Sequence, residues 1–400
     1  MLAALPLAAD VAASVMLSDR TEARVRDPGD SPTGASIDIA NTPDARLILA
    51  SPRTDFTLAY TPRLTLWDVN DIGVQPLWLH TGLARVAWHD EDTALSLEQD
   101  ATYGATNFAG LTFAPSPEEQ PAMPPRVDVI PTSQIVQFES STTTLGSRIV
   151  GRRWEFRSHV GYQLSGGADD ASRLVVPLQK GPLADATITF AQSPVDHFAT
   201  IATASQTEFS SGPEIALGEV DEGWKHRWSP LTETTFALGL SEASVRPSPV
   251  VESFRETNPV AEAILDDGML IDGDHVTVRL DARLGPVVNR LLGIVDERVQ
   301  GSILSKWTHR PFVMSAFASA QQSVPTDSAY AIALLTGELA LSYTATEAVV
   351  FDMGVRGLLQ KANQPIVSTA TPGATAIVEG NLGQGIVFVG VTLRAPTMRL

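Results

Sequence analysis

The sequence contains no cysteine, and this absence excludes several kinds of chemistry. Without thiols the chain forms no disulfide, offers no thiolate nucleophile and builds no cysteine-based metal site. A chain without thiols also suits export through an oxidising compartment, where a stray thiol is a liability. Charged residues are scarce as well, because they make up 18% of the chain against about a quarter in typical soluble proteins.

Long hydrophobic runs are absent too. No stretch reaches the roughly 18 consecutive apolar residues that a transmembrane helix needs, so the sequence predicts no such helix. A transmembrane β-barrel leaves a weaker trace, because lipid-facing and lumen-facing residues alternate along each strand and average out. The mean hydropathy of +0.04 is therefore compatible with a membrane protein.

Basic residues are in deficit. The chain has 28 Lys and Arg against 46 Asp and Glu, which gives a net charge of −18. Proteins that bind nucleic acid need basic surfaces that neutralise phosphates, so this balance argues against nucleic acid as a partner. It is typical of a protein with acidic, solvated loops.

Motifs of common enzymes and cofactor sites are missing. The sequence has no G-x-S-x-G elbow, no H-E-x-x-H zinc motif and no Walker loop. The seven histidines are spread over different segments, and only His159 lies among other charged residues on a predicted polar face. We therefore expect a protein that is not an enzyme and binds no cofactor.

What the sequence does contain is alternation of apolar and polar residues. In residues 152–164, successive side chains belong to two opposite faces of a predicted strand. The apolar face is Trp154, Phe156, Val160, Tyr162 and Leu164, and the polar face is Arg153, Glu155, Arg157, His159 and Gln163. Similar stripes of about 10 to 15 residues recur along the chain. Strands of soluble proteins average about five or six residues, whereas a tilted membrane strand needs about nine to eleven, so their length favours a membrane barrel over a soluble β-sandwich.

The connections between these stripes fall into two classes that alternate along the chain. The short ones are 51–54, 89–92, 144–147, 193–196, 229–232 and 344–346. The long ones are 27–36, 70–75, 105–130, 165–183, 246–296 and 360–384. Short periplasmic turns opposite long external loops are typical of outer-membrane barrels.

The fold class predicted from these patterns is all-β, a single antiparallel transmembrane β-barrel of about 16 strands. The expected strands are 12–26, 37–50, 55–69, 76–88, 93–104, 131–143, 148–164, 184–192, 195–209, 214–228, 232–245, 297–307, 311–321, 328–343, 347–359 and 385–396. Residues 275–283 also alternate, either as a hairpin arm inside loop 246–296 or as part of an added strand pair that makes 18 strands. Residues 1–10 are expected to be a residual signal segment or a flexible N-terminus, and residues 11–400 the barrel.

The pattern from residue 11 onward resembles bacterial outer-membrane β-barrel proteins, porins and export barrels among them. Residues 385–395 (GIVFVGVTLRA) look like the C-terminal strand that the barrel-assembly machinery recognises in this class, although the last residue is Leu400 and not an aromatic. The resemblance implies a place in the bacterial outer membrane. It also implies outer-membrane lipid and the barrel-assembly machinery as partners.

Charged residues on the polar faces are the candidate site residues, because they would line the lumen. They are Arg63, Glu98, Asp100, Arg153, Glu155, Arg157, His159, Glu338, Asp352 and Arg356. Asp266, Asp267, Asp272 and Asp274 are weak calcium candidates, and a solvated acidic loop is the preferred interpretation of this cluster.

Three functions remain open for such a barrel. The first is a channel for small solutes or ions, with the long loops 105–130 and 246–296 as candidate constrictions. The second is a non-channel subunit of an envelope complex for secretion, motility or polysaccharide export, which binds partner proteins through its loops. The third is an adhesive or structural barrel with a blocked lumen.

Overall fold

The computed structural model describes residues 11–27, 36–67, 75–107, 135–247, 253–271, 273–289, 293–324, 331–362, 366–368, 376–378 and 381–399. The expected signal segment 1–10, much of loop 105–130 and part of loop 360–384 lie outside these residues.

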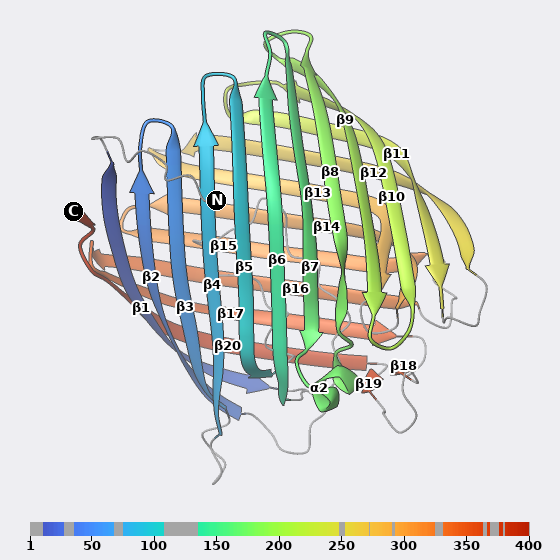
Figure 1. Cartoon of the computed structure of the whole chain (residues 1–400). Helices are drawn as coiled ribbons and strands as arrows, with labels where there is room; N and C mark the ends of the chain where they lie inside the picture. The colour runs from blue at the N-terminus through green and yellow to red at the C-terminus, as the bar shows by residue number, and fades with distance from the viewer. Residues whose placement is uncertain are drawn as a thin grey trace, which may run out of the picture.

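In the described part of the chain, a barrel of 18 antiparallel strands accounts for almost all of the structure (Figure 1). Its strands are β1 (Ala12–Asp27), β2 (Ser36–Ala50), β3 (Thr54–Trp67), β4 (Gln75–His89), β5 (Thr93–Asn107), β6 (Ile135–Val150), β7 (Trp154–Gly167), β8 (Gln179–Ala191), β9 (Asp196–Phe209), β10 (Glu214–Arg227), β11 (Thr232–Arg246), β12 (Phe254–Ile271), β13 (Asp274–Asn289), β14 (Ile294–His309), β15 (Phe312–Val324), β16 (Ile332–Thr346), β17 (Val349–Ala362) and β20 (Asn381–Arg394). The short elements are helix α2 (Asp170–Val175) and strands β18 (Ile366–Ser368), β19 (Ala376–Val378) and β21 (Met398–Arg399).

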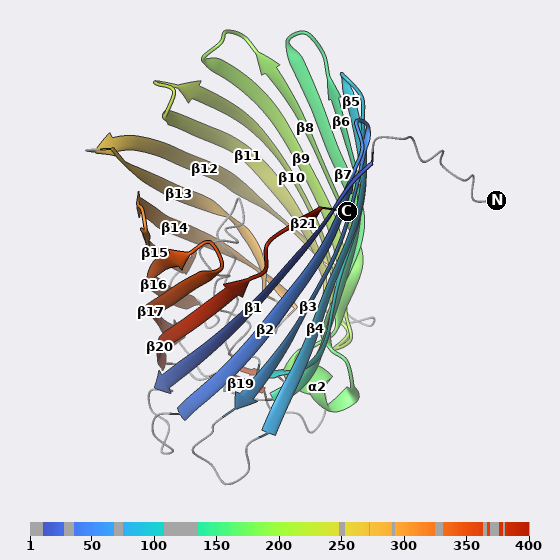
Figure 2. The same ribbon diagram turned by 90° about the vertical axis from the view of Figure 1, so that its left-hand side faces the viewer.

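Each strand pairs with the next strand in the chain, and the ring closes between the first and the last long strand. Residues 18–27 of β1 pair with residues 385–394 of β20. Figure 2 shows these two strands side by side. Closure removes the free edges that an open sheet would present, which is what a barrel wall in a lipid bilayer requires.

The two ends of the barrel differ in their connections. At one end, here called the turn end, the strands join through short segments such as 51–53, 90–92 and 151–153. At the other end, here called the loop end, most connections are longer, and one of them, 168–178, contains helix α2. The predicted division into short turns and long loops is largely confirmed.

The predicted strand pattern needs two corrections. The segment 246–296, assigned mainly to a loop, forms the paired strands β12 and β13, so of the two predictions for residues 275–283 the added strand pair is confirmed and the barrel has 18 strands. The predicted turn 144–147 was wrong, because β6 continues to Val150 and the turn is at residues 151–153. Leu145 belongs to the apolar outer stripe, opposite Val160 of β7, so the alternation continues through the expected turn.

Side chains alternate between an apolar outer face and a polar inner face. Leu58, Val160, Leu339 and Val389 point outward, and each is about half exposed. Their neighbours along the strands point inward, and many of these are polar. Outward Trp88, Trp154 and Phe198 lie near the turn end, while outward Trp78, Tyr103 and Tyr162 lie nearer the loop end. Phe209, at the loop end of β9, is buried on the inside.

Candidate functional site: the barrel lumen

Among the charged side chains on the described inner face of the barrel, three groups stand out, and seven of the ten predicted lumen residues belong to two of these groups. No helix in the described ranges is long and apolar enough to cross a membrane.

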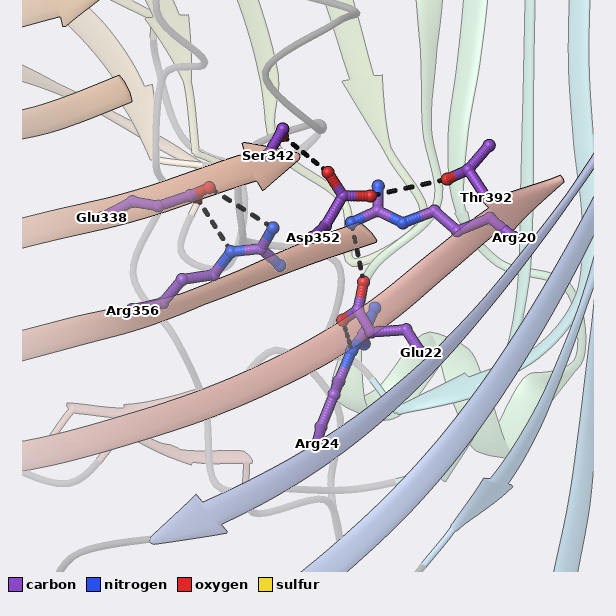
Figure 3. Close-up of polar contacts among 8 residues, drawn as sticks. All are labelled: Arg20, Glu22, Arg24, Glu338, Ser342, Asp352, Arg356 and Thr392. Carbon is purple, nitrogen blue, oxygen red and sulfur yellow. Dashed lines mark hydrogen bonds and ion pairs between the residues drawn. The ribbon is translucent and has the colours of Figure 1, made fainter. Parts of the chain in front are cut away.

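The first group, here called the arginine cluster, consists of Arg20, Glu22, Arg24, Arg63, Glu338, Asp352 and Arg356. Figure 3 shows all of these residues except Arg63, extending from strands β1, β16 and β17. The structure thus brings together predicted residues from the start and the end of the chain. It does so because β1 lies beside β20 and β20 beside β17.

Glu338 and Arg356 form the best-defined ion pair in this cluster. The Nε of Arg356 donates to Glu338 at 2.8 Å, and its Nη2 lies 3.5 Å from the other carboxylate oxygen. The guanidinium also lies over the ring of Phe388, 4.5 Å from the ring centre. Both charged side chains are at most 10% exposed, so the pair is held by its own hydrogen bonds and by ring stacking more than by water.

Glu22 on β1 is shared by two arginines of the same strand. Arg24 forms a hydrogen bond to one carboxylate oxygen, and the Nη2 of Arg20 lies 3.0 Å from the other. Residues two apart in a strand share a face, so the three side chains line the same strip of the inner wall. Arg63 reaches this strip from β3, across the small side chain of Ala40 on β2.

Asp352 is held by hydroxyl groups. Ser342 of β16 donates to it at 2.6 Å, and Thr392 of β20 donates at 3.4 Å (Figure 3). Its carboxylate therefore has hydrogen-bond donors other than the nearby arginines.

The second group, here called the turn-end cluster, lies on β6, β7 and β8. Arg148 and Arg157 both form hydrogen bonds to Glu155. The Nδ1 of His159 lies 2.9 Å from a carboxylate oxygen of Asp185. These side chains are more exposed than the arginine cluster, as Arg157 is 57% and His159 45% exposed.

Three further predicted residues lie apart from both clusters. Glu98 and Asp100 are on the inner face of β5, and Glu98 lies 3.9 Å from Arg85 of β4. Arg153 lies in the exposed turn at 151–153 and not on the strand that was predicted for it. This placement follows from the correction of the turn between β6 and β7.

The third group, here called the carboxylate cluster, consists of Glu219, Asp221, Asp281 and Arg283. Arg283 of β13 donates through Nη2 to both oxygens of Glu219 on β10, at 2.7 and 2.9 Å. One oxygen of Asp221 is buried without a hydrogen-bond partner. In a ring of 18 strands, β10 is opposite β1, so Glu219 and Asp221 lie across the lumen from the β1 part of the arginine cluster, while β13 is three strands from β16.

The loop ends of β13 and β14 fold into the barrel. The pairing of β13 with β12 ends at Leu284, while its pairing with β14 continues to Asn289. Residues 285–289 and 293–296, here together called the inward hairpin, therefore leave the wall. Near the tip, Val288 and Val295 pack against a buried apolar cluster on the inner face of β9, β10 and β11, formed by Phe209, Ile215 and Val245.

The calcium candidates do not form a site. Asp266 lies 3.6 Å from Arg279, and Asp267 accepts a hydrogen bond from Thr232 at 2.7 Å. Asp274 binds the ring nitrogens of Trp307 and His309, and Asp272 lies outside the described residues. Across the described ranges, no group of three or more His, Asp or Glu side chains is arranged to hold a metal ion.

Sequence analysis missed several lumen residues. Arg20, Glu22 and Arg24 alternate with Thr21, Ala23 and Val25, and this pattern could have revealed them. The charged residues of β13 were missed because the segment was assigned to a loop. Ion pairs between distant strands, such as Arg283 with Glu219, leave no local signal in the sequence.

A family comparison covers nearly the whole chain. The model of the EpsX exopolysaccharide export family matches residues 7–391. A search among curated proteins finds no match.

Solved outer-membrane proteins share the fold. The FrpB iron transporter of Neisseria meningitidis (F3-3 variant) is 9% identical, with a TM-score of 0.50 over 95% of this chain and 81% of that chain. OccK9 (OpdG) of Pseudomonas aeruginosa is 8% identical, with a TM-score of 0.51 over 96% of this chain and 98% of that chain. The predicted resemblance to outer-membrane β-barrels is thus confirmed at the level of the fold, and the family match places the chain in the EpsX exopolysaccharide export family.

Proposed function

We propose that this protein is an outer-membrane channel through which an exopolysaccharide leaves the bacterial cell. The observation that carries the proposal is a polar, charged inner face enclosed by an apolar outer face, in a chain of this family. The predicted channel and the predicted part in polysaccharide export are thereby combined in one function, and the proposal includes no catalytic step.

The outer face supports a position in the membrane. Half-exposed apolar side chains such as Leu97, Val160 and Leu339 would contact outer-membrane lipid, which we propose as a partner. Aromatic rings near both strand ends suit the two membrane interfaces. The turn end would face the periplasm, and insertion would depend on the barrel-assembly machinery.

The inner face suits the passage of a hydroxylated polymer. Sugar hydroxyl groups donate and accept hydrogen bonds, and the wall offers many alternative partners, including Thr142, Thr187 and Ser205 on β6, β8 and β9. For transport, the polymer must bind the lumen wall strongly enough to enter and weakly enough to leave. The inward hairpin would narrow this path near its external opening.

A lumen block tests the proposal directly, because the chain has no cysteine of its own. Glu98→Cys places a thiol on the inner face of β5, and Leu97→Cys places one on the outer face of the same strand. A bulky methanethiosulfonate reagent should then reduce the single-channel conductance of the purified Glu98→Cys protein in a planar bilayer. In cells it should reduce surface polysaccharide, and a reductant should restore both.

The Leu97→Cys variant is the matched control, since its label points into lipid and should leave conductance and export unchanged. Equal effects of the two labels would contradict transport through the lumen. A folded, inserted protein that never conducts would also overturn the channel proposal.

The second candidate is a non-channel barrel that binds partners of an export complex through its loops. The inward hairpin favours it, because a hairpin fixed inside the barrel would fill part of the lumen. This candidate predicts that lumen labels leave export unchanged, while substitutions in the loops abolish it.

A further inference from the structure

We propose that the arginine cluster is a binding site for carboxylate groups of an acidic polysaccharide, with Arg63 as its principal ligand-binding residue. This inference rests on the proposed function and deepens it, because it names the class of polymer that the lumen recognises.

The carboxylates of the arginine cluster already accept hydrogen bonds or ion pairs from other side chains of the cluster and its neighbours. Glu338 accepts from Arg356, and Glu22 is shared between Arg20 and Arg24. Asp352 accepts from the hydroxyl groups of Ser342 and Thr392. None of these carboxylates forms a hydrogen bond or an ion pair with Arg63 in the described part of the chain.

The donors, in contrast, are not all occupied. The Nε atoms of Arg63 and Arg20 are buried and have no hydrogen-bond partner among the residues that the structure describes. The Nη2 of Arg20 lies 3.0 Å from Glu22, but its angle does not make a hydrogen bond. A buried guanidinium N–H without an acceptor is costly, so the site is short of oxygen atoms.

The charges around Arg63 favour an anion. The charged groups that act most strongly on Arg63 are the three guanidinium groups of Arg20, Arg24 and Arg356 and the single carboxylate of Glu22. A second carboxylate beside Arg63 would reduce the repulsion among these cations. Because the planar guanidinium matches the two oxygens of a carboxylate, a uronic acid fits better than a neutral sugar.

The site has an opening to the lumen. Gly390 of β20 lies between Glu22 and Asp352 in the ladder, and a Cβ added there would lie 3.3 Å from the backbone oxygen of Thr21 and 3.8 Å from the Nε of Arg20. The glycine therefore lets the side chain of Arg20 lie against the inner surface of β20. The side chain of Arg20 is 22% exposed, which keeps the cluster accessible from the lumen.

Block of channel current by oligosaccharides tests the proposal. The probes are oligogalacturonate and a neutral malto-oligosaccharide of equal length, added to the purified full chain in a planar bilayer. Arg63→Gln should weaken the block by oligogalacturonate about tenfold, the factor that corresponds to one charge-assisted hydrogen bond. The neutral oligosaccharide, whose block depends on its size, should act equally on wild type and variant.

Arg153→Gln is the matched control, because it removes the same charge from an exposed turn outside the cluster. It should leave the block by oligogalacturonate unchanged. Raising the salt concentration from 0.1 to 1 M should weaken the block of wild type by the acidic oligomer, since screening shortens the range of charge interactions to about 3 Å.

The results separate this inference from the proposed function. The protein could conduct and be blocked equally by both oligomers, or the block by oligogalacturonate could be the same in Arg63→Gln and Arg153→Gln. Either result would rule out the carboxylate site and leave the channel proposal in place. If the protein never conducts, the proposed function fails. The site is then tested in detergent, where galacturonate should raise the melting temperature of wild type but not of Arg63→Gln. Acetate at the same concentration should leave the melting temperature of wild type unchanged. An equal rise in melting temperature with acetate would overturn the specific site.

Discussion

At the scale of single residues, the lumen shows how charged side chains are buried inside a barrel. Glu338 and Arg356 are almost fully covered, yet each has a partner of opposite charge. Burial removes the hydration of both groups, and only the mutual hydrogen bonds and the stacking of Arg356 on Phe388 compensate for it. Loss of one member of the pair should therefore destabilise the folded barrel more than loss of both members.

This sensitivity gives a prediction. Glu338→Leu should destabilise the folded barrel by about 3–5 kcal/mol, because it leaves Arg356 as an uncompensated buried charge. The double variant Glu338→Leu/Arg356→Leu should recover most of that loss. The free energy of unfolding of each variant is measured by urea titration in detergent, with the gel shift between folded and unfolded barrel as the readout. Equal destabilisation of the single and double variants would show that packing and not charge dominates here.

At the scale of secondary-structure elements, glycines on the inner face allow large side chains to lie flat against the wall. A Cβ added to Gly354 of β17 would lie 2.6 Å from the ring of Phe388 and 2.5 Å from the backbone oxygen of Leu339. Gly354 therefore makes room for the aromatic ring on which Arg356 stacks. Gly357, on the outer face of the same strand, has no described atom within 4 Å of an added Cβ.

The two glycines should respond differently to the same substitution. Gly354→Ala should destabilise the barrel by about 1–3 kcal/mol, because the strand or the Phe388 ring must shift. Gly357→Ala should be neutral or slightly stabilising, since glycine weakens a strand interior. Unfolding midpoints in urea provide the comparison, and a Gly354→Ala variant as stable as wild type would contradict the close packing.

The inward hairpin is the second element with a testable role. A Cβ added to Gly293 would lie 2.9 Å from the Cβ of Pro213, somewhat closer than the roughly 3.8 Å of a disulfide. Pro213→Cys/Gly293→Cys should therefore form a disulfide after a small movement and hold the tip against β9 and β10. If the hairpin moves aside during export, oxidation should abolish surface polysaccharide and a reductant should restore it.

Each single-cysteine variant is a control for this experiment, because neither can form the bond. Normal export by the oxidised double variant would show that the hairpin is a fixed part of the lumen wall. Gel mobility with and without reductant confirms that the disulfide has formed.

At the scale of the whole molecule, the barrel separates an arginine-rich part of its wall from a carboxylate-rich part. The arginine cluster lies on β1, β3, β16 and β17, whereas Glu219 and Asp221 of the carboxylate cluster lie on β10, opposite β1 in the ring. Opposed walls of this kind create a field across a channel and tune its ion selectivity. The turn-end cluster adds a more exposed group of charges at the opposite end from the inward hairpin.

The position of each arginine should decide its effect on selectivity. Arg157→Gln should shift the reversal potential in a salt gradient toward cation selectivity, because it removes a positive charge from the lumen wall. Arg153→Gln should shift it less, because Arg153 lies in the turn outside the wall. Equal shifts would show that the charge at the turn-end opening, and not the wall, sets selectivity.

Much of the fold could be predicted from period-two alternation. The stripe from Trp154 to Leu164 has the predicted faces, and so do the stripes that contain Glu98, Glu338 and Arg356. Alternation failed where polar and small residues replaced the apolar stripe, as in β12, and where a Gly-Ser pair at 146–147 resembled a turn. In both places the ladder to the neighbouring strand, and not local composition, maintains the strand.

The sequence by itself determined that the chain forms long two-faced strands joined by short and long connections, because side-chain alternation is a local property of a strand. Only the tertiary structure decided which charged side chains contact one another. Barrel closure brings Glu22 of β1 near Arg356 of β17, and strand curvature brings Arg283 to Glu219. These contacts depend on the register and bending of strands far apart in the chain, so no local pattern of residues encodes them.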